Sequence, residues 1–199
     1  MPVRDALLAI LAEEPCYGYQ LRAEFDRRTG SSWPLNVGQT YSTLDRLVRD
    51  GLVERGEADA EGQIPYRITD AGRGAASSWF AAPVDRAAES RDDLAVKLAV
   101  AATLGSVDAA AVVVAQRRAS SAEVADLERR LDEAEAAADA GAGAAGLARR
   151  VTLAARLERA RSDLRLLDRV GPELARHPRG LPLDGASERP RRGRPPKGA

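Results

Sequence analysis

The chain has 199 residues, which excludes a large multidomain enzyme and allows one domain, or one small domain with an accessory segment. Its 44% hydrophobic and 30% charged residues are typical of a globular protein, and the 4% of aromatic residues favours helices over a β-sandwich or barrel. The formal net charge is zero, and the single cysteine and single histidine exclude an internal disulfide and a paired-histidine metal site.

Three helices are predicted in the first fifty residues. The first covers residues 3–14, where apolar side chains recur at helical spacing. The second is short and ends at Thr29-Gly30. The third begins near Val37, with Asn36 as its N-cap, and ends at Gly51. Its predicted apolar face consists of Val37, Tyr41, Leu44 and Val48.

Two short runs of strand-forming residues, 52–58 and 63–69, follow the third helix and flank a predicted turn. They predict a two-stranded β-ribbon. Thr69 is placed to cap a fourth helix that begins at Asp70. This order of helices and ribbon is typical of a winged helix-turn-helix domain, predicted over residues 1–82, whose third helix can lie in the DNA major groove.

Residues 83–172 predict a helical dimerisation and effector region. Ser90 precedes an alanine-rich helix, and Ser106 is placed to cap the next helix at Val107. Two later seams at a/d spacing predict a helical hairpin: Val124, Leu127, Leu131, Ala134 and Ala138, then Leu153, Leu157, Ala160, Leu164 and Leu167. Two seams exceed what one hairpin needs, so we expect a coiled coil with a partner helix in a homodimer. The predicted fold class is mainly α with a small β-ribbon.

Several separated motifs in residues 1–80 resemble the PadR family of transcriptional regulators. They are Tyr17-Gly18-Tyr19-Gln20-Leu21; Leu35 through Tyr41 with Leu44, Arg46, Leu47 and Gly51-Leu52-Val53-Glu54; and Tyr66-Arg67-Ile68-Thr69-Asp70-Ala71-Gly72. The predicted hairpin is similar to the dimerising C-terminal region of that family. The resemblance implies a dimeric repressor of a palindromic operator, often released by a small molecule such as a phenolic acid or a drug-like cation.

The candidates for base contacts lie on the third helix. Gln39, Ser42 and Thr43, with Arg46 one turn later, are predicted on its exposed face. Thr40 and Tyr41 lie at the edge of that face. The Tyr41 ring is expected in the core, either with its hydroxyl near a phosphate or in plain core packing.

The predicted wing is the ribbon, and its candidates for DNA contacts are Arg55, Gln63 and Arg67. It also carries Glu57, Asp59 and Glu61, whereas the wings of the PadR family are usually basic. Residues 1–80 hold nine arginines against twelve acidic residues, a net charge of −3. This charge weakens the counterion-release contribution to DNA affinity.

Residues 173–199 are predicted to form a disordered basic tail, because proline, glycine and arginine replace the periodic pattern. The segment Arg192-Gly193-Arg194-Pro195 resembles an AT-hook, which lays its glycine on the minor-groove floor and its arginines along a narrow A·T groove. The DNA-binding candidates of the tail are Arg191, Arg192, Gly193, Arg194 and Lys197. The alternative is a solvated basic tail.

Other features point to few further partners. Trp79 and Phe80 are candidates for contact with a small aromatic effector, the alternative being burial in the core. We find no motif for an enzyme, a cofactor or a metal site, and no apolar run long enough for a membrane span, so the expected location is the cytoplasm. Two alternatives keep the fold without specific DNA binding: a ligand-sequestering protein, and a module that recruits a protein partner.

Overall fold

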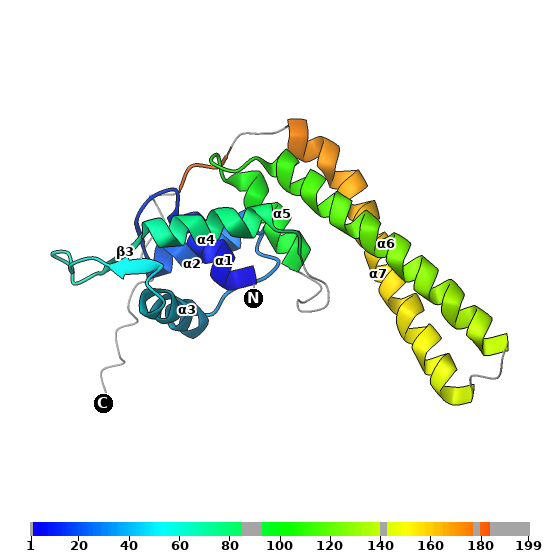
Figure 1. The fold of residues 1–199 in the computed structure, drawn as a ribbon. Helices are drawn as coiled ribbons and strands as arrows, with labels where there is room; N and C mark the ends of the chain where they lie inside the picture. Colours follow the sequence, from blue (N-terminus) through cyan, green and yellow to red (C-terminus); the bar gives the residue numbers. More distant parts are fainter. Residues whose placement is uncertain (1, 85–92, 140–142, 177–179, 184–199) are drawn as a thin grey trace, which may run out of the picture. The chain divides into compact units, whose positions relative to one another are not determined.

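The computed structural model describes residues 2–84, 93–139, 143–176 and 180–183. The chain divides into two compact units: unit 1 comprises Met1–Ser77 and Leu181–Ala199, and unit 2 comprises Ser78–Gly180. Helices dominate the described residues, and a small sheet belongs to unit 1 (Figure 1). The prediction of a mainly α fold with a small β element is confirmed.

The sheet of unit 1 has three antiparallel strands rather than the two that the sequence predicts. They are β1 (Cys16–Tyr17), β2 (Val53–Arg55) and β3 (Pro65–Ile68), in the order β1-β3-β2. Cys16 pairs with Tyr66, and Val53 pairs with Ile68. Strand β1 is missed by pattern analysis because two residues are too few to show an alternation.

Unit 1 also contains four helices: α1 (Pro2–Leu11), α2 (Gly18–Arg28), α3 (Val37–Arg49) and α4 (Asp70–Ala81), the last of which continues into unit 2. Their ends follow the predicted caps. The Asn36 side chain accepts a hydrogen bond from the Gln39 amide at 2.7 Å, and the Thr69 hydroxyl accepts one from the Gly72 amide at 3.0 Å. Gly51 follows α3 with φ of +70°, a conformation that glycine adopts without strain.

Helix α1 is the centre of unit 1. Every residue from Ala6 to Leu11 is at most 1% exposed, so the helix is buried all round rather than on a single stripe. Its neighbours contribute fully buried side chains, which are Leu21 and Phe25 from α2 and Leu44 and Leu47 from α3. Burial of each such side chain stabilises the fold by about 1.5–3 kcal/mol.

Unit 2 contains α5 (Asp93–Thr103), α6 (Ala109–Asp139) and α7 (Gly143–Arg176). Helix α6 begins two residues later than predicted, and its first turn is capped by Asp108, whose carboxylate accepts a hydrogen bond from the Ala111 amide at 3.0 Å. The predicted cap at Ser106 is therefore wrong: a side chain three residues before the first helical residue cannot reach the N2 or N3 amide. The other predicted cap, Ser90, lies outside the described residues.

Helices α6 and α7 pack along each other as an antiparallel hairpin (Figure 1). Its core contains members of both predicted seams: Leu127 and Ala134 from α6, and Leu153, Leu157 and Ala160 from α7, flanked by Val124 and Leu131. Side chains of both seams are thus buried within the hairpin, and the seams provide no independent evidence for a partner helix. Helix α7 continues through Pro172 to Arg176, beyond the predicted start of the tail.

Candidate nucleic-acid interface

The exposed face of α3 differs from the predicted one. Thr40 and Thr43 are 0% and 4% exposed, whereas Val37 is 57% and Tyr41 40% exposed. The buried face is Thr40, Thr43, Leu44 and Leu47, so the predicted apolar face is rotated by about one residue. The prediction of an exposed Thr43 and a core Tyr41 is wrong: the threonines occupy the buried face, and the Tyr41 ring lies against Gly18 at the start of α2 with the residue 40% exposed.

The buried threonines use their hydroxyls within the helix. Thr40 Oγ1 donates to the Asn36 carbonyl at 3.2 Å, and Thr43 Oγ1 donates to the Gln39 carbonyl at 2.8 Å. They cannot read base edges from these positions. The predicted candidates that remain accessible are the half-buried Gln39 and the exposed Ser42 and Arg46, together with Tyr41, which is also exposed.

The accessible side chains of α3 are held close to the helix. Ser42 Oγ donates to the Gln39 carbonyl at 3.1 Å, and Arg46 Nε donates to the Ser42 carbonyl at 3.2 Å. These are exposed hydrogen bonds to backbone oxygens, which a base edge or a phosphate can replace at little cost. The arrangement presents an amide, a hydroxyl and a guanidinium along one side of α3.

A cavity of about 260 Å³ adjoins this face and is lined by all four tyrosines of the chain: Tyr17, Tyr19, Tyr41 and Tyr66. Gly18, Gly62, Gln63 and Ile64 complete its wall. We call this the tyrosine cavity. It joins the start of α2, α3 and the wing, and Ile64 at its rim is 40% exposed. Aromatic side chains with hydroxyl groups are suited to contact sugars and phosphates of a DNA backbone.

The wing loop is organised by Asp59, whose importance the sequence analysis missed. Its carboxylate accepts hydrogen bonds from the Glu61 amide at 3.0 Å, the Gln63 amide at 2.8 Å and the Tyr17 hydroxyl at 2.7 Å. The bond to this carboxylate, and its negative charge, raise the pKa of Tyr17. An aspartate three residues before a glycine in a turn (Gly62, φ +73°) is the sequence signal that indicates this role.

The predicted wing residues lie in different environments. The Arg55 guanidinium forms an ion pair with Asp45 of α3 and lies 5.9 Å from the centre of the Tyr66 ring. Arg67 is exposed on β3, opposite Glu54 in the register. Gln63 lines the tyrosine cavity. The tail candidates, Arg191, Arg192, Gly193, Arg194 and Lys197, lie outside the described residues.

The predicted effector residues belong to unit 2. Phe80 is 8% exposed and Trp79 is half-buried, with 4.7 Å between their ring centroids. The ammonium group of the buried Lys97 lies 5.6 Å from the centre of the Trp79 ring and donates to the Ala82 carbonyl. A cation thus already occupies one face of the indole.

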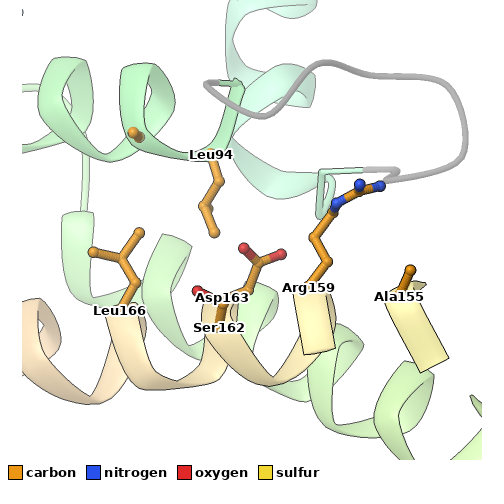
Figure 2. Close-up of a pocket in the computed structure, with 7 residues that line it drawn as sticks. Leu94, Ala155, Arg159, Ser162, Asp163 and Leu166 are labelled. Carbon is orange, nitrogen blue, oxygen red and sulfur yellow. The ribbon is translucent and has the colours of Figure 1, made fainter. Parts of the chain in front are cut away.

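Unit 2 also contains a cavity of about 560 Å³ between α5 and α7 (Figure 2). In Figure 2, Leu94 extends from α5 toward Asp163 on α7, with Arg159 one turn away. Trp79 and Phe80 are not among the residues that line it: Leu94, Ala95, Ala155, Arg159, Ser162, Asp163 and Leu166. The walls combine apolar side chains with one arginine and one carboxylate.

Within the described ranges, no three histidine, cysteine or carboxylate side chains come together in a group that could hold a metal ion. None of the helices in those ranges combines the length and the apolar character that crossing a membrane requires.

Comparison with known proteins covers both units. The model of the PadR-like transcriptional regulator family matches residues 7–78, and that of the virulence activator α C-terminal domain matches residues 90–175. A relative, the probable transcriptional regulator Rv1176c of Mycobacterium tuberculosis, is 27% identical over 186 residues, which are 87% of this chain and 98% of that protein.

Two solved structures are similar over most of the chain. PadR of Bacillus subtilis, in complex with operator DNA, is 18% identical with a TM-score of 0.40 and aligns over 87% of this chain and 99% of that one. The virulence activator AphA of Vibrio cholerae is 24% identical with a TM-score of 0.36, over 87% and 98%. The two family models therefore identify residues 7–78 as similar to the PadR-like family of transcriptional regulators and residues 90–175 as similar to the virulence activator α C-terminal domain.

Proposed function

We propose that this protein is a dimeric, ligand-responsive repressor that binds a palindromic operator through α3. The observation that carries the proposal is the outer face of α3, where Gln39, Ser42 and Arg46 are accessible beside the tyrosine cavity. The match of residues 7–78 to a family of transcriptional regulators supports it. A regulator of this kind acts on DNA in the cytoplasm.

The chemistry of the three side chains suits direct base contacts. Gln39 can form two hydrogen bonds with adenine, Arg46 can form two with guanine, and Ser42 can donate or accept. Gln39 lies in the first turn of α3, the part of a recognition helix that contacts base edges. Thr40, Thr43 and Tyr41 then have supporting roles, with the tyrosine hydroxyl available for a phosphate.

Positive charge for the DNA backbone comes from the wing and the tail. Arg55, Gln63 and Arg67 are the proposed phosphate contacts of the wing, and Arg55 must exchange Asp45 for a phosphate to serve there. We assign the AT-hook-like tail to an adjacent minor groove, where its arginines compensate for the net charge of −3 on residues 1–80.

Dimerisation is assigned to unit 2. Val114 on α6 is 67% exposed, and Leu147 and Val151, one turn apart on α7, are 54% and 60% exposed. These apolar side chains are suitable for coiled-coil contact with a second copy. A symmetric dimer presents two α3 helices to two half-sites about one helical turn, or roughly 34 Å, apart.

The effector is proposed to be a small aromatic molecule bound near Trp79 and Phe80. Such a molecule releases the operator by binding more tightly to a dimer geometry in which the two α3 helices no longer match the groove spacing.

Fluorescence anisotropy tests the DNA-binding function. The purified chain is titrated onto the duplex upstream of its own gene, with a scrambled duplex as competitor, at two salt concentrations. Tight binding that resists the competitor supports the proposal. Weak binding that ignores sequence and disappears with salt overturns it and favours a ligand-sequestering or protein-recruiting module.

A further inference from the structure

The segment Leu181–Leu183 belongs to unit 1, although it follows the long helix α7 of unit 2. Arg28 Nη2 donates a hydrogen bond to the Leu181 carbonyl at 2.9 Å, and Arg27 Nη2 donates one to the Pro182 carbonyl at 2.6 Å. Two neighbouring arginines of α2 thus hold two successive carbonyls more than 150 positions later in the chain. We call residues Leu181–Leu183 the strap.

The two arginines are fixed by one buried carboxylate. Glu24 is 4% exposed and accepts hydrogen bonds from Arg27 Nε at 3.1 Å, Arg27 Nη2 at 2.8 Å and Arg28 Nε at 3.0 Å. The Arg28 side chain is 0% exposed. Burial orients this guanidinium and removes water from around it. The hydrogen bond that it donates to the Leu181 carbonyl is therefore stronger than a solvent-exposed hydrogen bond.

The strap runs along α2 toward the start of that helix. Leu181 contacts Arg28 and Pro182 contacts Arg27, near the end of α2, whereas Leu183 lines a cavity of about 230 Å³ with Glu24, Gln20 and Tyr17. Tyr17 also lines the tyrosine cavity, beside Tyr41 of α3. Leu183 therefore lies near the end of α2 that adjoins the proposed DNA-binding face.

We propose that the strap docks on α2 in order to deliver the basic residues 189–197 to DNA held by α3 of the same chain. This inference rests on the proposed function and adds how the tail is positioned. Arg191 is eight residues beyond Leu183, a reach of at most about 29 Å, which is within one helical turn of DNA. Measured from the end of α7 at Arg176, the tether is fifteen residues.

The shorter tether has a measurable consequence. The effective concentration of a tethered segment falls roughly as the −3/2 power of tether length, so lengthening the tether from eight to fifteen residues lowers DNA affinity about threefold. The test uses Leu183→Ser, which removes an apolar side chain from the cavity that Leu183 lines. Leu181→Ser is the matched control, because Leu181 is 40% exposed. Neither substitution changes the charge or the buried core.

The first measurement tests, in the absence of DNA, whether the strap is docked on α2. Cys16, the single cysteine of the chain, lines the same cavity as Leu183, so its reaction rate with a neutral maleimide reports whether the strap is in place. We expect Leu183→Ser to raise this rate several-fold and Leu181→Ser to leave it unchanged. Equal rates in all three proteins overturn the docked strap.

The second measurement tests whether the docked strap brings the basic tail to DNA. Leu183→Ser is expected to weaken DNA binding about threefold in the full chain, and to have no effect in a full-length variant in which Arg191, Arg192, Arg194 and Lys197 are glutamines. An equal loss in both backgrounds, or no loss in either, overturns the proposal. If the unaltered chain binds no specific duplex, the proposed function fails, while the Cys16 rates still decide whether the strap docks.

Discussion

Gly18 shows how one residue shapes the proposed DNA-binding face. A Cβ atom at this position would lie 2.8 Å from Cε1 of Tyr41 and 3.1 Å from its hydroxyl oxygen. The missing side chain lets the Tyr41 ring rest on the start of α2, where its hydroxyl remains near the surface of the tyrosine cavity. The Tyr-Gly-Tyr motif is therefore a packing requirement as well as a family resemblance.

Gln39 provides the residue-scale test of base contact. If its amide forms two hydrogen bonds with one adenine, Gln39→Ala costs about 1–3 kcal/mol of binding free energy at that operator position and relaxes the preference for that base. Anisotropy with a set of single-base operator variants measures this. A loss that is uniform across all sequences would instead identify Gln39 as a backbone contact.

Cys16 predicts a dependence of stability on pH. Burial, with smaller contributions from Glu24 and Glu14, raises the pKa of its thiol from 9.0 to about 12. The unfolded chain loses this proton above pH 9 while the folded chain keeps it. The free energy of unfolding should thus fall by about 1.4 kcal/mol per pH unit from pH 9 toward 12.

The control for this effect is Cys16→Ala, which removes the thiol and leaves the tyrosines that also titrate in this range. Urea unfolding at pH 7.5, 9 and 10 should show the stability difference between the two proteins narrowing above pH 9. Parallel pH profiles of the two proteins would contradict a buried, protonated thiol.

At the scale of elements, the wing depends on the start of α2. Asp59 joins the two through the Tyr17 hydroxyl, so the loop between β2 and β3 is tied to β1 and α2. One acidic residue of the wing, Asp59, therefore has a structural role. Its carboxylate orders the loop, even though its negative charge repels the DNA backbone.

Asp59→Ala is expected to loosen the wing loop. The amides of Glu61 and Gln63 lose their acceptor, so their hydrogen exchange should accelerate about tenfold or more, whereas the exchange of α1 stays unchanged. Glu57→Ala, which removes the same charge from an exposed wing position, is the matched control. Acceleration of the same size in both variants would mean that charge, not the hydrogen bonds, orders the loop.

The helical hairpin of unit 2 is predicted to depend on its buried leucines. Leu157 is 4% exposed in the cluster with Leu127 and Leu153, so Leu157→Ala should destabilise unit 2 by about 2–5 kcal/mol. The half-buried Leu164, changed in the same way, should cost less. Hydrogen exchange of α6 and α7 measures both, and equal costs would contradict the observed packing.

The degree to which sequence predicts structure varies between elements. Asn36 and Thr69 are predictable caps because their signals are local. The face of α3 is not, since tertiary packing buries Thr43 and leaves the larger Tyr41 outside. The strap also leaves no local pattern, because its partners Arg27 and Arg28 are distant in the chain.

At the scale of the whole molecule, the chain joins a winged-helix unit to a helical hairpin and then returns to the first unit. Base contacts are assigned to α3, dimerisation to unit 2, and additional affinity for DNA to the basic tail. This division of roles explains how residues 1–80, with a net charge of −3, can serve in a DNA-binding protein.

Selection from a random pool of DNA duplexes tests sequence-specific binding by a symmetric dimer most directly. We expect sequencing of the bound pool to recover a palindrome whose half-sites lie about one helical turn apart. Enrichment of A·T content alone, without a palindrome, would contradict it, because the tail would then account for all of the binding.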